Sequence, residues 1–274
     1  MSDLLIAFEE YLSVTKALDT LTISSYLGDL SQLEIWSQKK LTQLETSDVL
    51  TFLATFDNKR TLNRKLSSIN AFFHFCHKKN FNHESIKIPM AKIPKNLPKY
   101  MSSQEILQKI SMIDRSTLIG LRDYALILFL YASGCRISEA LSIERNDIVQ
   151  GWLKIRFAKG EKERMVPLAP IAIEALNAYL EHETMHSSAL WLNYKGEVLS
   201  RISAYKIVKQ YLGVSPHVLR HSFASALIIG GADLRVVQEL LGHSSLETTQ
   251  IYTHIQKKNL ADTMYKYHPL KGAS

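Results

Sequence analysis

The sequence is poor in the residues that build disulfides, metal sites and membrane spans. Its only two cysteines, Cys76 and Cys135, have neither a disulfide-framework nor a metal-type spacing. No apolar run reaches the roughly 18–20 residues of a membrane span, and the first residues carry acids where a signal peptide would carry basic residues. We therefore expect a cytoplasmic protein with no membrane partner and with two buried, unreactive thiols.

Two sequence patterns of nucleotide and phosphate chemistry are also absent. The chain has no GxxxxGK[ST] phosphate-binding loop and no acidic cluster of the two-metal type. The histidines that come closest to a zinc pattern have arginine and tyrosine partners in place of cysteine or carboxylate, namely His217, His221, His243 and His254. We therefore expect no cofactor and no metal.

What the chain does contain is enough apolar sequence for two ordinary domains. Its 274 residues are 46% hydrophobic and 22% charged, as in globular proteins, and domains usually run to about 100–200 residues. Charge is segregated along the chain: residues 1–57 hold three lysines and nine acids, whereas residues 58–99 hold ten lysines or arginines and one acid, Glu84. A basic block of this kind suits a surface that follows phosphates, although a solvated helix face and a soluble linker would look the same.

The first part of the chain has the apolar spacing of four amphipathic helices. They cover residues 3–15, 22–36, a short stretch that opens with Thr46 or Ser47 as N-cap, and about 61–79. The next stretch, 86–100, holds three prolines and four lysines, so neither helix nor strand can persist there. We therefore expect a helical domain at 1–85, a basic linker at 86–100 and a second domain at 101–274.

The second domain is predicted to be mainly helical with one small antiparallel sheet. A capping-box pattern opens a helix at Ser102, and residues 121–132 are apolar enough for a core helix. Alternation in 152–157, a turn at 159–162 and a return at 164–167 predict a β-hairpin. Helical patterns then resume at about 170–183, 200–211, 216–229, 233–241 and 246–253.

One of these helix starts carries a possible phosphate site. Ser215 is its predicted N-cap and Pro216 its first residue, so His217 and Arg220 lie on one face of the first turn. The free N–H groups and dipole of a helix N-terminus attract anions. Taken alone, however, this pattern also fits a solvated arginine beside a capping histidine.

The block that begins here closely resembles a known family. HVLRHSFASALIIGG, DLRVVQELLGHSS and ETTQIYTH follow one another as in the second conserved region of the tyrosine recombinases, the phage-integrase and Xer family of site-specific DNA recombinases. The resemblance implies that Tyr252 is the nucleophile, that His217 and Arg220 form the His-x-x-Arg pair, and that His243 is the histidine after the Leu-Gly turn.

The family's first region and its hairpin lysine have counterparts upstream. YASGCRISEAL resembles the first region, which implies that Arg136 is the other catalytic arginine and Glu139 its support. AKGEKER resembles the family's hairpin turn and implies that Lys159 is the catalytic lysine. The four-helix unit and the following junction resemble the family's core-binding (SAM-like) domain and linker. Candidate DNA contacts elsewhere are Arg60, Arg64, Lys65, Lys95, Lys162 and Arg164.

Membership of this family would imply a specific reaction and specific partners. The tyrosine hydroxyl would form a 3′-phosphotyrosyl link and release a 5′-hydroxyl, with no need for ATP or metal. Partners would be duplex DNA with a recombination site, a homo- or heterotetramer assembled through the C-terminal tail, and a septal DNA translocase. The tail helix, around Leu260 and Met264, would dock on a neighbouring protomer, and packing on its own domain is the alternative.

The compact length favours a Xer-type recombinase of chromosome or plasmid dimer resolution, which serves chromosome partition at cell division. A mobile-element integrase with the same chemistry is the first alternative. A type IB topoisomerase would share the catalytic logic, and a non-catalytic architectural DNA-binding protein would keep the basic surface without needing the nucleophile. All six catalytic positions are filled, which argues against the last of these.

Overall fold

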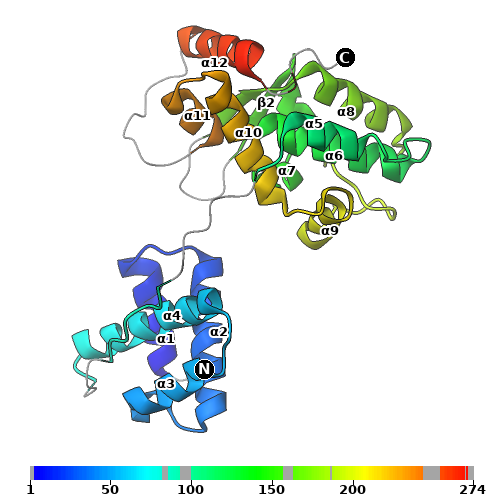
Figure 1. Ribbon diagram of the computed structural model, residues 1–274. Coiled ribbons are helices and arrows are strands. Elements are labelled where there is room, and N and C mark those ends of the chain that lie inside the picture. Colours follow the sequence, from blue (N-terminus) through cyan, green and yellow to red (C-terminus); the bar gives the residue numbers. More distant parts are fainter. Residues whose placement is uncertain are drawn as a thin grey trace. The chain divides into compact units, whose positions relative to one another are not determined.

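The computed structural model describes residues 3–81, 86–92, 100–156, 163–185, 187–242, 254–268 and 270, with 254–260 as backbone only. The chain forms two compact units, Met1–Asn96 and Leu97–Ser274, which Figure 1 colours from blue to cyan and from green to red. The division falls inside the proline-containing stretch in which we expected the linker. No helix in the described parts is long and apolar enough to cross a membrane.

The smaller unit has the four helices that the sequence predicts. They are α1 (Asp3–Glu10), α2 (Thr20–Ser37), α3 (Thr46–Ala54) and α4 (Lys59–Lys78), with a π-helical turn at Tyr11–Thr15 and a 3-10 turn at Leu41–Gln43. The side chains of Asp19 and Asn58 cap α2 and α4 by accepting backbone N–H bonds. The N-cap of α3 is Glu45, one or two residues before the predicted Thr46 or Ser47, because its side chain and that of Asp48 form a reciprocal capping box.

The beginning of the predicted linker is fastened to α4. Asn63 exchanges two hydrogen bonds of 2.8 Å with the backbone of Ala91, and Asn70 exchanges two, of 2.9 and 3.1 Å, with the backbone of Ile88. Ile86 is buried in the core of the same unit. Residues 86–92 therefore form neither helix nor strand, as expected, but they pack against the smaller unit.

The larger unit is mainly helical around a small sheet. Its helices are α5 (Ser103–Ile110), α6 (Leu118–Ser133), α7 (Ile137–Leu141), α8 (Pro170–His182), α9 (Arg201–Leu212), α10 (Pro216–Gly230), α11 (Leu234–Leu241) and α12 (His254–Tyr267). Strands β1 (Ile148–Val149), β2 (Trp152–Ile155) and β3 (Arg164–Pro167) form an antiparallel sheet in that order. The predicted hairpin is confirmed in its two strands, and its predicted turn at 159–162 lies outside the described residues.

Helix α6 is the centre of the larger core. Its residues from Ala125 to Ser133 are all buried, and it packs against α8 and α10. The helix ends at Gly134, whose φ of +61° is the left-handed conformation that glycine adopts most easily. This stop places the following residues, including Arg136, at one end of the core.

Helix α12, drawn red in Figure 1, packs on its own unit. It contacts α10, α11 and β3, and Met264 and Leu270 are buried in the larger core. The buried His268 holds the segment after α12: its Nε2 lies 3.0 Å from the carbonyl of Ala132, and its Nδ1 accepts the N–H of Leu270 at 3.0 Å. The described part of the tail thus adopts the alternative of packing on its own domain.

Candidate active site

Arg136 lies between the end of the buried helix α6 and the start of the short helix α7. It is the N-cap of α7, and its backbone N–H donates to Oε2 of Glu139 at 2.7 Å. Its Nη1 donates to Oε1 of the same carboxylate at 2.9 Å. Glu139 therefore fixes both the backbone and the guanidinium of Arg136, which is the supporting contact that the sequence led us to expect.

Arg220 reaches the same carboxylate from α10. Its side chain is buried, and its Nη1 and Nη2 donate to the carbonyls of Gly134 at 2.7 Å and Leu241 at 2.6 Å. Nη1 also lies 3.9 Å from Oε2 of Glu139. The structure therefore brings Arg136 and Arg220 together at one acid, although their positions are 84 residues apart in the sequence.

A third arginine contacts this carboxylate. Arg164 at the start of β3 donates from Nη1 and Nη2 to the two oxygens of Glu139, at 3.0 and 2.8 Å. Its Nε donates to the carbonyl of Leu240 at 2.9 Å. We call Arg136, Arg164, Arg220 and Glu139 the arginine cluster. It carries three positive charges against one negative charge, so it attracts anions.

The pKa shifts within the arginine cluster follow from this imbalance. Burial alone would raise the pKa of Glu139, but hydrogen bonds and charge from Arg164, with the backbone N–H and charge of Arg136, hold it below its ordinary value. Burial and the neighbouring charge of Arg136 lower the pKa of Arg220 to about 10. At neutral pH Glu139 is therefore ionised and Arg220 remains charged.

His217 lies one turn before Arg220 at the exposed N-terminus of α10. Partial burial and the charges of His221, Arg220 and Arg136 lower the pKa of His217, so its imidazole is neutral at pH 7 and can accept a proton. The ring of His221 lies at 4.4 Å, edge to face. Pro216 is at the first helical turn as predicted, while Ser215 occupies the N-cap position without a side-chain cap bond. Among the described residues no group of His, Cys, Asp or Glu could hold a metal ion.

The other predicted site residues lie outside the described residues. They are Lys159, His243 and Tyr252 of the catalytic set, and Lys95 and Lys162 of the candidate DNA contacts. Their neighbours along the chain are described, however. Lys159 lies between the two strands of the hairpin, and His243 directly follows Gly242, which ends α11 in a left-handed conformation. Tyr252 precedes α12 by two residues.

The candidate DNA contacts on α4 have different surroundings. Arg60 is exposed in the first turn. Arg64 is also exposed, but its guanidinium pairs with Asp29, with Nη2 and Oδ1 2.7 Å apart. The side chain of Lys65 is buried, where its ammonium donates to Asp29 at 3.0 Å and to Gln32. Lys65 is thus an internal counter-ion, and it does not belong to a surface that contacts DNA.

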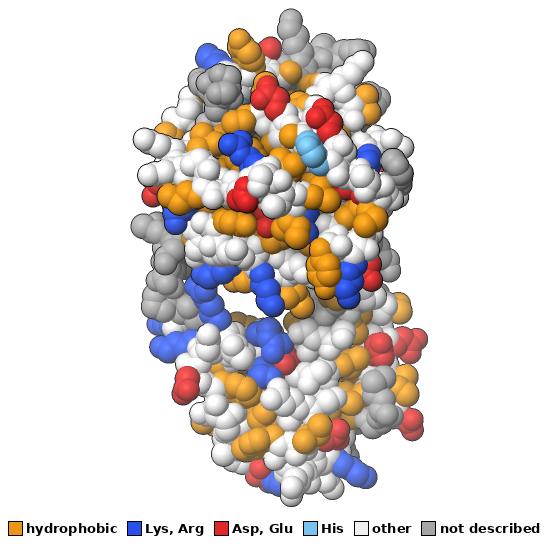
Figure 2. All heavy atoms as spheres, turned by 90° about the vertical axis from the view of Figure 1, so that its right-hand side faces the viewer, with side chains coloured by type: hydrophobic (Ala, Val, Ile, Leu, Met, Phe, Trp, Pro, Cys, Tyr) orange, Lys and Arg blue, Asp and Glu red, His pale blue; other side chains and the backbone are white. Residues whose placement is uncertain are grey.

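The packing of α4 against α2 pairs part of the basic segment with an acid, so less positive charge is exposed than the sequence suggests. Asp29 comes from the acidic segment and Arg64 and Lys65 from the basic one, so part of the segregated charge is neutralised inside the unit. On the face shown in Figure 2, blue Lys and Arg side chains still gather at one end of the smaller unit. The basic surface is therefore smaller than the sequence count indicates.

The burial of Arg164 is a feature that sequence reasoning missed. We expected this residue to contact DNA, yet only 2% of its side chain is exposed. The register of the hairpin indicates this burial. Leu153 and Ile155 are the buried residues of β2, and their partners on β3 are Val166 and Arg164, respectively. Because side chains alternate along a strand, the sequence already places Arg164 on the buried face.

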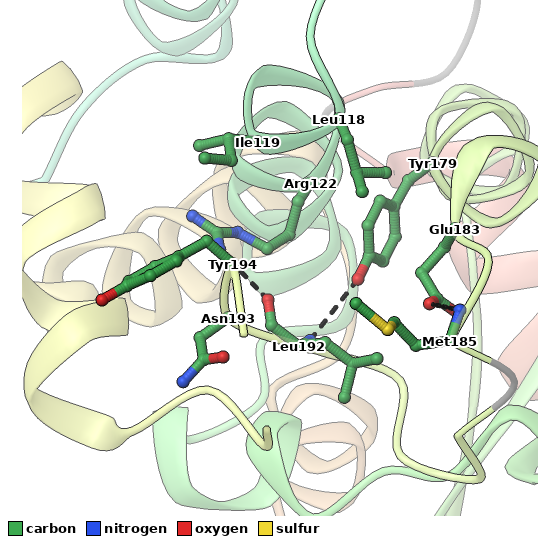
Figure 3. A pocket seen from close by; sticks show the side chains of 9 residues that line it. All are labelled: Leu118, Ile119, Arg122, Tyr179, Glu183, Met185, Leu192, Asn193 and Tyr194. Atoms are coloured by element: carbon green, nitrogen blue, oxygen red, sulfur yellow. Dashed lines mark hydrogen bonds between the residues drawn. The ribbon is translucent and has the colours of Figure 1, made fainter. Parts of the chain in front are cut away.

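A small pocket of about 50 Å³ lies elsewhere in the larger unit (Figure 3). Its polar side chains serve the fold: Nη1 of Arg122 donates to the carbonyl of Leu192 at 3.0 Å, and the N–H of Leu192 donates to the hydroxyl of Tyr179 at 3.4 Å. None of the predicted site residues lines it. The pocket is therefore separate from the arginine cluster.

Comparisons with known proteins match both units of the chain. The model of the phage integrase family matches residues 99–259, and that of the phage integrase N-terminal SAM-like domain matches residues 5–80. The tyrosine recombinase XerD of Listeria monocytogenes serovar 1/2a is 36% identical over 98% of this chain and 99% of its own length. The tyrosine recombinase XerC of Thermodesulfovibrio yellowstonii is 34% identical over 96% and 95%.

Solved structures show the same fold. XerH recombinase, in a post-cleavage complex with its palindromic difH substrate, has a TM-score of 0.67 and 26% identity, and the match covers 94% of this chain and 83% of that one. Lambda integrase in a tetramer on a Holliday junction has a TM-score of 0.70 at 16% identity, over 91% and 79%. With relatives above 30% identity over nearly its whole length, the chain belongs to the phage integrase family, as a Xer-like tyrosine recombinase, a class of DNA strand transferases.

Proposed function

We propose that this chain is a Xer-type recombinase that cuts one DNA strand at a time through Tyr252 and rejoins it to a partner strand. The observation that carries the proposal is the convergence of Arg136 and Arg220 on Glu139. Positive charges outnumber the negative one within the arginine cluster, which favours the approach of a phosphodiester anion. Planar N–H forks match the two non-bridging oxygens of that group better than an ammonium would.

The reaction would begin with attack of the Tyr252 hydroxyl oxygen on phosphorus. A tyrosine hydroxyl has an ordinary pKa of about 10 and approaches an anion, so it needs help at neutral pH. Arg136 and Arg220 would stabilise the added negative charge of the pentacoordinate transition state, where one well-placed donor contributes roughly 2.7–4 kcal/mol. The neutral imidazole of His217 suits a proton acceptor or a phosphate donor.

The bond to the 5′ sugar oxygen would then break, and Lys159 would supply the proton to that leaving oxygen. The product is a 3′-phosphotyrosyl link with a free 5′-hydroxyl. Attack by a 5′-hydroxyl of the partner strand reverses these steps and restores the tyrosine. His243 would donate a further hydrogen bond to the phosphate. One phosphoester bond is exchanged for another at each stage, so the sequence of steps consumes no ATP.

The biological setting follows from the relatives' names and from the charge of the chain. We propose duplex DNA with a specific site as the partner, a tetramer of identical or paired recombinases on that DNA, and a cytoplasmic location. Resolution of chromosome or plasmid dimers, with a septal DNA translocase as activator, is the proposed role. Arg60, Arg136 and Arg220 are the described basic groups that we assign to the DNA surface.

The test is to trap the covalent intermediate. The protein is incubated with fragments of its own genome that carry suicide nicks, and the DNA in protein-linked adducts is sequenced. We expect adducts at one recurrent sequence and none with Tyr252→Phe. Tyr265→Phe is the matched control, because Tyr265 lies on α12 with 88% of its surface exposed. An undiminished adduct in Tyr252→Phe would overturn the proposal, and relaxation of supercoils without a preferred site would indicate a topoisomerase.

A further inference from the structure

We propose that Arg164 is a positioning residue of this active site, which holds Glu139, and through it Arg136, against the end of α11. The inference rests on the proposed function, because orienting Glu139 and Arg136 matters to the reaction only if Arg136 and Arg220 bind a DNA phosphate. Arg164 would itself touch no DNA.

The sheet register directs Arg164 inward. Its partner across the hairpin is Ile155, which is fully buried, and the next inward residue of β3 is the fully buried Val166. An arginine at such a position must find partners inside the protein, because an unpaired buried charge is strongly destabilising. Among the described residues, its partners include the carboxylate of Glu139 and the backbone carbonyl of Leu240, which both belong to the surroundings of the site.

The contact with Glu139 is bidentate. The two terminal nitrogens of Arg164 donate to the two carboxylate oxygens, at 3.0 and 2.8 Å, which fixes the plane and the rotation of the carboxyl group. The same two oxygens receive the backbone N–H and Nη1 of Arg136. The position of the Arg136 guanidinium is therefore set by a carboxylate that Arg164 orients.

The third donor of Arg164 connects this pair to α11. Its Nε donates to the carbonyl of Leu240, and the next carbonyl, of Leu241, accepts from Arg220. A Cβ added at Gly242 would lie 2.7 Å from Nη1 of Arg164, so only glycine allows the chain to pass this close. Adjacent carbonyls at the end of α11 thus hold both arginines, directly before the segment that contains His243 and Tyr252.

A positioning role and a direct DNA contact predict different effects of substituting Arg164. An arginine that neutralises a phosphate changes DNA affinity and lowers the salt slope of binding by about one. A residue that only orients catalytic groups leaves affinity and salt slope alone and lowers the rate of cleavage. For metal ligands, loss of an orienting outer partner costs roughly 10- to 100-fold in affinity or activity, which sets the expected scale.

The experiment compares Arg164→Lys and Arg164→Met with Arg156→Met. Arg156 is a matched control, because it lies on the same hairpin and its Nη2 pairs with Asp147 at 2.7 Å, away from Glu139. The probe is a suicide duplex that carries the sequence recovered from the trapped adducts. We expect affinity and salt slope to stay within about twofold of wild type, and single-turnover adduct formation to fall about 10- to 100-fold in both Arg164 variants only.

A double variant asks whether Arg164 acts through Glu139. If it does, Glu139→Gln and Arg164→Met together should cost no more rate than the worse of the two alone, because each removes the same restraint. Rate losses that multiply would overturn the proposal. A loss of affinity with a shallower salt slope would also overturn it, in favour of a DNA contact.

A second measurement needs no DNA. The backbone amide of Arg136, which donates to Glu139, should exchange its hydrogen about fivefold faster in Arg164→Lys than in wild type. In Arg156→Met the exchange rate of this amide should equal that of wild type. Unchanged exchange in Arg164→Lys would refute the positioning role. Because this result does not depend on cleavage, it decides the inference even if wild type forms no adduct and the proposed function fails.

Discussion

Nη1 of Arg220 donates a hydrogen bond of 2.7 Å to the carbonyl of Gly134, the residue that ends α6. A residue from α10 is thereby fixed to the loop that leads to Arg136. The two arginines are thus joined twice, through this carbonyl and through Glu139. The geometry of the arginine cluster therefore involves the backbone of Gly134 as well as the side chain of Glu139.

Gly134→Ala should therefore be more harmful than an alanine at a comparable glycine. Both Gly134 and Gly213 end helices with positive φ, so each substitution costs about 1–2 kcal/mol of backbone strain. At Gly134 the added Cβ would also meet the Phe223 ring at 2.4 Å, whereas nothing lies within 4 Å at Gly213. We expect Gly134→Ala to lower the free energy of unfolding by roughly 1–3 kcal/mol more, measured by urea denaturation. Equal losses would contradict this.

Glu139→Gln should remove a charge that the arginine cluster needs. Breaking a buried ion pair on one side costs about 3–5 kcal/mol at neutral pH. Because the folded pKa of Glu139 lies below its ordinary value of 4.5, wild type keeps this advantage above pH 4.5 and loses it as pH falls through the folded pKa. Urea denaturation of both proteins between pH 7 and 3 measures the difference. If the stability difference between wild type and Glu139→Gln already decreases between pH 7 and 6, the pKa of Glu139 is not lowered and the prediction is wrong.

His268 should make the docking of the tail sensitive to acid. Burial lowers the pKa of His268 from 6.5 to about 4, so the folded state resists protonation. The unfolded segment binds a proton below pH 6.5 and the docked one only near 4, so stability falls between these values, by up to about 3 kcal/mol.

His268→Gln keeps a donor for the Ala132 carbonyl but does not titrate. Limited proteolysis between pH 7.5 and 4.5, with mass spectrometry of the C-terminal peptides, should release the wild-type tail at a higher pH than the glutamine variant. Identical release curves would show that another group controls the docking.

Asp29→Ala should destabilise the smaller unit far more than the loss of an exposed pair. It would leave the buried Lys65 ammonium without its carboxylate, at a cost of about 3–5 kcal/mol. Lys39→Met is the control, because Lys39 pairs with Asp48 at the surface, where ion pairs contribute about 0–1 kcal/mol. Hydrogen exchange of the α4 amides reports the change. Similar exchange in the two variants would mean that the network around Asp29 contributes little.

The elements of this fold could be predicted from local sequence, because caps, apolar spacing and strand alternation act over a few residues. The beginnings of α5 and α10 follow from Ser102 and Pro216, and the paired strands follow from the alternation around Trp152. The convergence of Arg136, Glu139 and Arg220 was expected from motif resemblance alone. No local pattern could have placed them together.

The predictions that failed, DNA contacts at Lys65 and Arg164, concern charged residues whose partners are distant in sequence. Lys65 lies on the stripe of Ile69, Phe72 and Cys76 at helical spacing, so its position on α4 indicated burial although its charge indicated the surface. Its partner Asp29 is 36 residues away, and the carbonyl that holds Arg164 is 76 residues away. Such pairings depend on tertiary packing, which the local pattern of a single sequence does not contain.

The docked tail has a consequence for assembly. A segment tethered to its own binding surface competes at an effective concentration in the millimolar range. A tail offered by a second chain from dilute solution cannot displace it, since it would need a comparable local concentration. Two chains held side by side on one DNA reach that regime. Any docking of the tail on a second chain would therefore require that chain to be held close by, because Met264, His268 and Leu270 are already buried.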